Sequence, residues 1–477
     1  MFLPPLIYAS AWSTSWRDFK RNLRPISLLA IGLVFFTTLF VAIIARAIIP
    51  GLPWAVAFVL GAIVSPTDAV AATSIMQRLH IPHRIVTVLE GESLVNDASG
   101  IVAYQFAVVA VITGAFSLAD AGLQFVFESA GGIAIGLAIG WCLTLIHRRL
   151  DNPVLEIVMT LLTPFASYLL ADALHTSGVL ATVAAGLYLA RKSSVLFSAQ
   201  TRQQALAVWN VLVFLLNGLT FILIGLQLRN ILEQLDNTIA HHSVLNLIWY
   251  AVGICIATVV VRIIWVIPAT YLPRLLSRRV RERDPIPNWR NVAIISWTGM
   301  RGVVSLAVAL ALPEVTERGA PFPERPLVIY LTFCVILFTL VAQGLSLPFL
   351  IRILGLKDDG ESEVEEVKAR KVALQTALSR IDELIDQELA PREIADHLRE
   401  HYATRAQNLQ DSADGKMNEQ SKNQFQSYRT VEQEVVRVAR NSVVRLRDQG
   451  EINDEVLRRI ERELDLEEEQ LEGREER

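Results

Sequence analysis

The stretch GESLVNDASG, residues 91–100, places two carboxylates, a hydroxyl and an amide within six residues, from Glu92 to Asp97. It lies inside the apolar segment 85–113, which is longer than the ~20 residues that an α-helix needs to cross the hydrocarbon core of a membrane. Ionisable side chains are rare at such depth and usually mark function. The stretch therefore predicts a membrane-spanning helix that carries a polar site.

The rest of the chain continues this apolar pattern to Leu356 and then becomes charged. The 477 residues are 52% hydrophobic, yet 31 of the 48 acidic residues follow Leu356. We expect an all-α protein with a membrane helix bundle at 1–356 and a helical tail at 357–477. We expect eleven membrane crossings, the first of them partial, at 1–15, 26–48, 52–77, 85–113, 123–147, 155–173, 176–191, 205–228, 244–271, 290–313 and 325–354.

The short loops differ in charge from one side of the predicted bundle to the other. One alternating set is rich in Lys and Arg, at 16–24, 77–84, 147–151, 191–194 and 274–284. Because basic loops stay on the cytoplasmic side, this set predicts a multi-pass protein of the cell membrane whose C-terminal tail is also cytoplasmic.

Two of the predicted crossings are interrupted. Pro66 removes a backbone donor in GAIVSPTDAVAATS (61–74), and Gly299 and Gly302 loosen SWTGMRGVVSLAVAL (296–310). A broken helix at membrane depth is tolerated where it is buried in protein or lines a cavity. One break in each half indicates a transporter with inverted repeats and a site near the midplane. Asp68, two residues after Pro66, fits an ion ligand or a cap of the second half-helix.

Helical spacing sorts the polar residues of the opening stretch. We expect Ser93, Asn96 and Asp97 on one face, where their hard oxygen donors suit a small cation, although a satisfied polar network between helices remains the alternative. Glu92 points about 100° away from Ser93 and can serve another partner. Arg262, in the middle of an apolar run, needs an anion. We predict an ion pair between Glu92 and Arg262, with Arg301 as the rival cation.

With these residues in place, the chain resembles the monovalent cation/proton antiporters, the group that includes the bacterial NhaP antiporters and the animal NHE exchangers. The resemblance extends over most of residues 1–354 and is carried by FLPPLIYASAW (2–12), GAIVSPTDAVAATS (61–74), GESLVNDASGIVAY (91–104), GLTFILIGLQL (218–228), VVVRIIW (259–265) and GMRGVVSLAVALALP (299–313).

The resemblance implies thirteen crossings in two inverted repeats, usually in a homodimer. It implies that Asp97 binds the ion or the proton and that Asp68, Ser93 and the backbone of Thr67 complete a Na⁺ site. Asn96 is then the neutral member of an Asn-Asp pair, which in this family goes with electroneutral exchange.

In two places the chain departs from the family's pattern. The family's FLPP motif lies in its third helix and here begins at Phe2, so we expect two leading helices and the start of a third to be absent. Ala9 stands where many relatives carry a carboxylate.

These observations predict a secondary active transporter that exchanges Na⁺ or Li⁺ for H⁺ by competition at Asp97, with a K⁺/H⁺ antiporter as the alternative. A channel fits less well, because a strongly binding carboxylate slows conduction. An enzyme is disfavoured, since Ser93 lacks the second glycine of a nucleophile elbow. The expected partners are Na⁺, H⁺ and the lipid bilayer, and we expect no cofactor and no nucleic acid.

Some motifs carry weaker predictions. The tail predicts amphipathic helices at 364–389, 432–450 and 452–473, and its His397 and His401 are too few for a metal site. The glycines at 132, 136 and 140 allow close helix approach, either inside the bundle or at a dimer contact.

Overall fold

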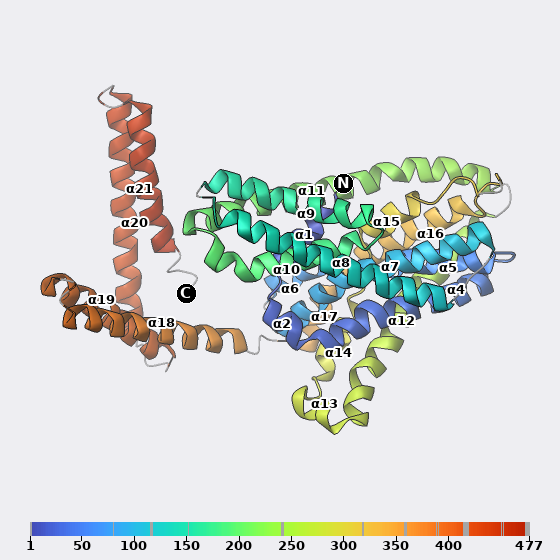
Figure 1. Ribbon diagram of the computed structural model, residues 1–477, viewed down its shortest axis with the longest axis horizontal. Coiled ribbons are helices and arrows are strands. Elements are labelled where there is room, and N and C mark those ends of the chain that lie inside the picture. Colours follow the sequence, from blue (N-terminus) through green and yellow to red (C-terminus); the bar gives the residue numbers. More distant parts are fainter. Residues whose placement is uncertain are drawn as a thin grey trace. The chain divides into compact units, whose positions relative to one another are not determined.

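A computed structural model shows how the chain folds (Figure 1). It describes residues 2–79, 81–114, 118–150, 152–239, 243–316, 319–356, 360–387, 389, 391–413, 419–449, 451 and 453–472. The described residues form helices and contain no β-strand, only an isolated bridge between Val315 and Pro321. The predicted all-α class is confirmed.

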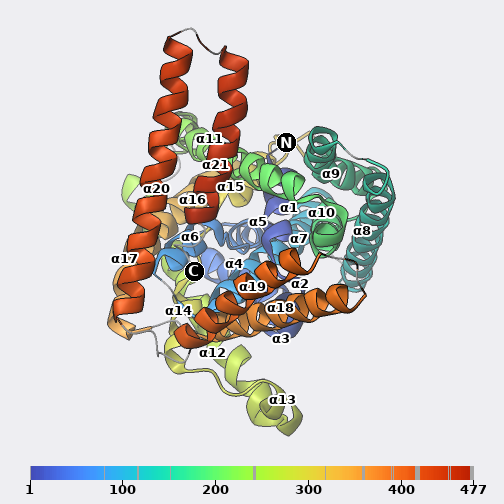
Figure 2. The same cartoon turned by 90° about the vertical axis from the view of Figure 1, so that its left-hand side faces the viewer.

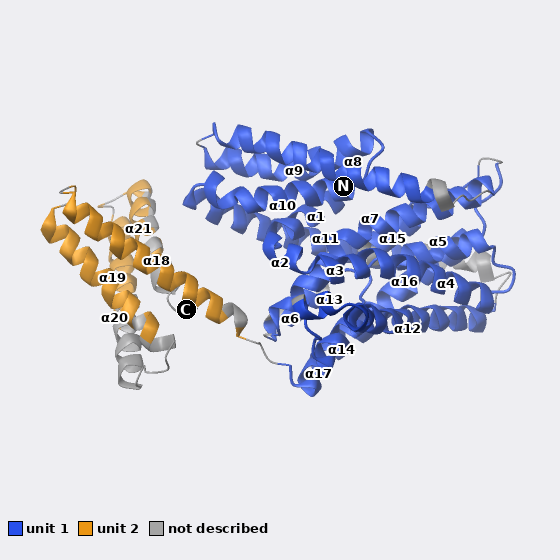
Figure 3. Cartoon of the chain, turned by 60° about the horizontal axis from the view of Figure 1, so that its bottom comes forward, with its two compact units in different colours: residues 1–359 blue, residues 360–477 orange. Residues whose placement is uncertain are grey.

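The chain divides into two compact units, residues 1–359 and residues 360–477 (Figure 3). The helices of the first unit are α1 (Leu3–Ser13), α2 (Trp16–Arg21), α3 (Leu23–Ser27), α4 (Val34–Ile48), α5 (Trp54–Val64), α6 (Val70–Arg78), α7 (His83–Thr113), α8 (Leu118–His147), α9 (Pro153–Ala173), α10 (Gly178–Leu196), α11 (Ala199–Ile239), α12 (Val244–Leu276), α13 (Arg278–Arg283), α14 (Trp289–Trp297), α15 (Val303–Leu310), α16 (Arg325–Phe338) and α17 (Gly344–Leu354). Wider π-helical turns, η1 (Leu28–Leu33) and η2 (Thr339–Gln343), join α3 to α4 and α16 to α17.

Eight helices among the described residues are long and apolar enough to cross a membrane. They are Leu23–Ile48, His83–Thr113, Ala121–His147, Pro153–Ala173, Gly178–Leu196, Ala199–Gln227, Val244–Leu276 and Arg325–Leu354. The other three predicted crossings consist of shorter helices: α1, the pair α5 and α6, and the pair α14 and α15. The difference between eight and eleven therefore reflects helices that are short or interrupted.

The two interruptions lie against each other. No helix covers residues 65–69, between α5 and α6, or residues 298–302, between α14 and α15. The backbone N–H of Asp68 donates to the carbonyl of Met300 at 2.8 Å, so one break satisfies a backbone group of the other. This contact positions the polar residues of both segments in the interior of the bundle.

The helices of the first unit pack as two groups. One contains α1 and α8–α10, and the other contains α4–α7, α12 and α14–α17, while α11 packs against α1 and α9 of the first group and against α15 and α16 of the second. In the first group, α8 approaches α10 closely along its glycine stripe: a Cβ added to Gly136 would lie 2.1 Å from the carbonyl oxygen of Ala181. The stripe therefore serves packing inside the bundle.

The second unit consists of α18 (Glu361–Asp386), α19 (Arg392–Ala413), α20 (Glu419–Asp448) and α21 (Asp454–Glu472). Helices α18 and α19 pack as one pair and α20 and α21 as another. Arg440 of α20 forms ion pairs with Asp465 and Glu468 of α21. Among the described residues, no group of three or more His, Cys, Asp or Glu side chains is placed to hold a metal ion. His397 and His401 therefore belong to no such group.

Candidate functional site

Helix α7 presents two polar faces. Glu92 and Asn96, four residues apart, lie on one face and are 1% exposed. Ser93 and Asp97, also four apart, lie on the other face and line a cavity. The prediction that Asn96 shares a face with Ser93 and Asp97 is wrong, because its side chain lies on the face of Glu92 and donates to Thr67.

On the first of these faces, Glu92 forms an ion pair with Arg262. Its two carboxylate oxygens accept hydrogen bonds from Nη1 and Nη2 of Arg262, at 2.5 and 2.8 Å, and both side chains are 1% exposed. Arg262 also donates from Nε to the carbonyl of Ile295 at 2.9 Å. Both charges are therefore paired with fork geometry, which is the arrangement that makes a buried ion pair tolerable.

Thr67, inside the first helix break, connects this face to the broken backbone. Its hydroxyl donates to Glu92 at 2.7 Å. The side-chain amide of Asn96 donates to the carbonyl and to the hydroxyl oxygen of Thr67, at 2.9 and 2.8 Å. Thr67 is thus fastened to α7 by three hydrogen bonds, and Asn96 acts as a donor to protein groups.

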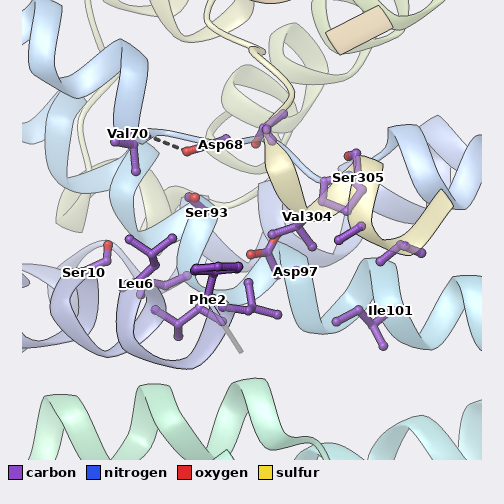
Figure 4. A pocket seen from close by; sticks show the side chains of 18 of the residues that line it. Phe2, Leu6, Ser10, Asp68, Val70, Ser93, Asp97, Ile101, Val304 and Ser305 are labelled. Carbon is purple, nitrogen blue, oxygen red and sulfur yellow. Dashed lines mark hydrogen bonds between the residues drawn. The ribbon is translucent and has the colours of Figure 1, made fainter. Parts of the chain in front are cut away.

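Asp97 lies on the wall of a cavity of about 410 Å³. Figure 4 shows Asp97 on α7, with Phe2 and Leu6 from the start of the chain on one side and Val304 of α15 on another. Asp68 and Ser93 line the same cavity. Within the described part of the chain, Asp97 has no ion-pair or hydrogen-bond partner. Asp97, Asp68 and Ser93 therefore share one space.

Asp68 has a structural contact as well as a place in the cavity. Its Oδ1 accepts a hydrogen bond from the backbone N–H of Val70 at 2.9 Å, at the start of α6 (Figure 4). Its Oδ2 lies over Gly302, where an added Cβ would be only 2.1 Å away. The carboxylate therefore caps one half-helix and touches the residue that precedes the other, α15. Both roles left open by the sequence are compatible with this position.

Ser93, the third predicted ligand in the cavity, is bonded to the first helix break. Its hydroxyl oxygen accepts a hydrogen bond from the backbone N–H of Ala69 at 3.3 Å. The rival cation, Arg301, is 1% exposed and points elsewhere: its Nη1 donates to the carbonyl of Ser65 at 2.5 Å, and its backbone N–H donates to Thr339 at 3.0 Å. The structure thus pairs Glu92 with Arg262, and Arg301 holds the backbone at the end of α5.

Comparisons with known proteins identify the family. The family pattern described as "Sodium/hydrogen exchanger, transmembrane" matches residues 1–353. An uncharacterized Na⁺/H⁺ exchanger of Mycobacterium tuberculosis is 38% identical over 477 residues, which cover 99% of this chain and 86% of the relative. The chain belongs to the sodium/hydrogen exchanger family.

Other members and one solved fold agree with this assignment. An uncharacterized Na⁺/H⁺ exchanger of Escherichia coli is 34% identical over 98% of this chain and 87% of its own length. A sodium, potassium, lithium and rubidium/H⁺ antiporter of Bacillus subtilis is 36% identical over 80% of this chain and 58% of its own length. The sodium proton antiporter MjNhaP1 of Methanocaldococcus jannaschii has a similar fold, with a TM-score of 0.57 and 20% identity over 74% of this chain and 84% of that one.

The family consists of transporters and not of enzymes, so the prediction of a cation/proton antiporter in a membrane is confirmed at that level. The exposed hydrophobic side chains along the long helices fit a lipid environment.

The sequence does not predict the burial of His147 and Glu156 in this exchanger. His147, at the end of α8, is 1% exposed, and Glu156, in the first turns of α9, is 4% exposed. Both ring nitrogens of His147 and Oε2 of Glu156 lack a hydrogen-bond partner among the described residues. Both residues lie near the ends of apolar runs, where a charged side chain usually reaches water, so hydropathy does not reveal their burial.

Proposed function

We propose that this protein exchanges Na⁺ or Li⁺ for H⁺ and that Asp97 carries either the cation or the proton. The observation that supports the proposal most directly is that Asp97 faces the cavity without a protein partner, next to Asp68 and Ser93. A carboxylate without a fixed counter-charge in such a place needs a mobile cation or a proton.

The polar residues near Asp97 have different roles in this proposal. Ser93 and Asp68 supply hard oxygen atoms, which suit an alkali cation. Asn96 is neutral and its amide is used in holding Thr67, so it adds no charge. We propose that one Na⁺ replaces one H⁺ at Asp97, which moves no net charge in a full cycle.

The packing of the helices supports a proposal for alternating access. The cavity is lined by α1 of one group, by α7 and α15 of the other, and by α11, which packs against both. We propose that movement between the groups exposes Asp97 to one side of the membrane at a time, as an exchanger requires.

Proteoliposomes that contain a pH-sensitive dye test the proposal. An imposed Na⁺ gradient should drive proton movement in the wild type, and Asp97→Asn should abolish it while the variant still folds. Holding the membrane potential at zero or at ~100 mV should leave the initial rate unchanged, although that potential is worth ~2.3 kcal/mol per net charge moved. Normal exchange by Asp97→Asn would rule out Asp97 as the carrier.

Exchange of K⁺ for H⁺ by the same site is the second candidate. It is favoured by the antiporter of Bacillus subtilis, whose name includes potassium. Carboxylate and hydroxyl oxygens suit either ion, and selectivity rests on the size of the space they enclose. The same assay with Na⁺, Li⁺ and K⁺ in turn distinguishes the two functions.

A further inference from the structure

The end of α12 and the short helix α13 project from the helical bundle of the first unit. Figures 1 and 2, which differ by a quarter turn, both show this projection. Helix α12 has 33 residues and so measures about 50 Å, whereas the hydrocarbon core is about 30 Å thick. The helix is therefore longer than one crossing needs, and the end that contains Pro268 and Pro273 is the part that leaves the bundle.

The projection exposes large apolar side chains. Leu272, Leu275 and Leu276 at the end of α12 are 51%, 68% and 78% exposed. Ile286 and Trp289, just after α13, are 51% and 62% exposed. Such side chains are unfavourable in water, and leucine and tryptophan are typical of segments that lie in the interface between lipid and water.

Arginines also cluster where the projection joins the bundle, around Asp284. Asp284, after α13, accepts hydrogen bonds from Arg84 of α7 at 2.5 Å and from Arg274 of α12 at 2.6 Å. Arg24 of α3 is a third cation, 3.6 Å from the same carboxylate. One carboxylate therefore faces three guanidinium groups, and Nε of Arg24 is buried without a hydrogen-bond partner in the described part of the chain.

Helix α13 adds to this excess. Arg278 pairs with Glu282, while Arg279 and Arg281 are exposed and form no ion pair among the described residues. Among the described side chains, six arginines and two carboxylates therefore lie around the projection. The planar guanidinium group binds phosphate with two hydrogen bonds, and clusters of basic residues beside a membrane helix attract anionic lipids.

We propose that the end of α12, α13 and the arginines around Asp284 form a binding surface for the phosphate headgroup of an anionic phospholipid. The excess of arginine matches the headgroup, and the exposed leucines and Trp289 match the acyl chains beside it. The apolar side chains distinguish a lipid from free phosphate, which has nothing to place against them. The inference does not depend on which cation the protein transports.

Native mass spectrometry of the full chain tests this surface. The protein is placed in nanodiscs of equal parts phosphatidylcholine and phosphatidylglycerol and released into detergent, and the retained lipids are counted. We expect the wild type to retain phosphatidylglycerol in preference. The double variant Arg279→Gln/Arg281→Gln should lose this retention by up to about thirtyfold, because two of the attracting charges are gone.

The control is Arg148→Gln/Arg149→Gln, which removes two exposed arginines from the α8–α9 turn, a loop predicted to lie on the same side of the membrane. It should retain phosphatidylglycerol like the wild type. Equal retention by Arg279→Gln/Arg281→Gln and the wild type, or equal loss in both double variants, would overturn the proposal.

A second comparison separates lipid from phosphate. Leu275→Ser/Leu276→Ser should weaken retention of phosphatidylglycerol, and an excess of inorganic phosphate should not displace the lipid from the wild type. Displacement by phosphate, with unchanged retention in the leucine variant, would show an anion site without a lipid role and would contradict the assignment.

Discussion

Two carboxylates on α7 lie five residues apart and have opposite surroundings. Glu92 is 1% exposed and bound by both nitrogens of the Arg262 fork. Asp97 is partly exposed, lines the cavity, and has no partner among the described residues. Five residues of helix rotate a side chain by about 140°, so the two groups face different neighbours. Position on the helix therefore decides whether a carboxylate of α7 is paired with an arginine or faces the cavity.

Asp284 extends the comparison to a carboxylate outside the membrane-spanning helices. Its burial raises the pKa, but the hydrogen bonds from Arg84 and Arg274 outweigh this and hold the pKa below its usual value. Its side chain is 20% exposed, so water screens these contacts more than those of Glu92. The protein therefore contains a buried, paired carboxylate (Glu92), a partly exposed, paired one (Asp284) and one that faces a cavity without a partner among the described residues (Asp97).

The largest effect is expected from Glu92→Ala. The substitution leaves Arg262 charged and 1% exposed without its anion, which typically costs about 3–5 kcal/mol. We expect a steep fall in folded protein and a lower melting midpoint, measured by fluorescence-detected size-exclusion chromatography after heating. Glu92→Ala/Arg262→Met should recover part of the loss, because it removes both charges. A single variant as stable as the wild type would show that the ion pair is dispensable.

Much of the fold follows from the sequence because it rests on hydropathy. The apolar runs predicted the membrane helices, and Pro66, Gly299 and Gly302 predicted the two breaks, which are regions without helix in the structure. Helix ends were less accurate. The predicted crossing ends at residue 271, whereas α12 continues to Leu276. A helix can extend into water as long as its backbone hydrogen bonds are formed.

The site was predictable in its residue types but not in its contacts. Spacing grouped Ser93 with Asp97 correctly, yet it also grouped Asn96 with them. On α7 an amide at position 96 is close to both polar faces, and its hydrogen bonds to Thr67, from a distant segment, decide which face it joins. The cavity-lining residues of α1 and α11 were not predicted, because only the packing of helices brings them near Asp97.

A smaller effect, on ion binding in the cavity that Asp97 and Asp68 line, is expected from Gly302→Ala. The new Cβ would lie 2.1 Å from Oδ2 of Asp68, so this carboxylate must move. If Asp68 is a ligand, displacement costs on the order of 1.4 kcal/mol, and the apparent affinity for Na⁺ in the dye assay should fall about tenfold. Gly218→Ala is the matched control, because no atom lies within 4 Å of its added Cβ. Unchanged affinity in Gly302→Ala would argue against Asp68 as a ligand.

The smallest effect is expected from Asp284→Asn, and it depends on pH. Because the folded-state pKa of Asp284 is held below its usual value, the carboxylate stabilises the fold fully above its unfolded pKa of about 3.9. This stabilisation is lost as the pH falls through the folded pKa. At pH 7 the melting midpoint of the variant should be about 1–3 °C below that of the wild type, and the gap should close as the pH falls below about 4. A gap of the same size at every pH would mean that Asp284 acts through shape and not through its charge.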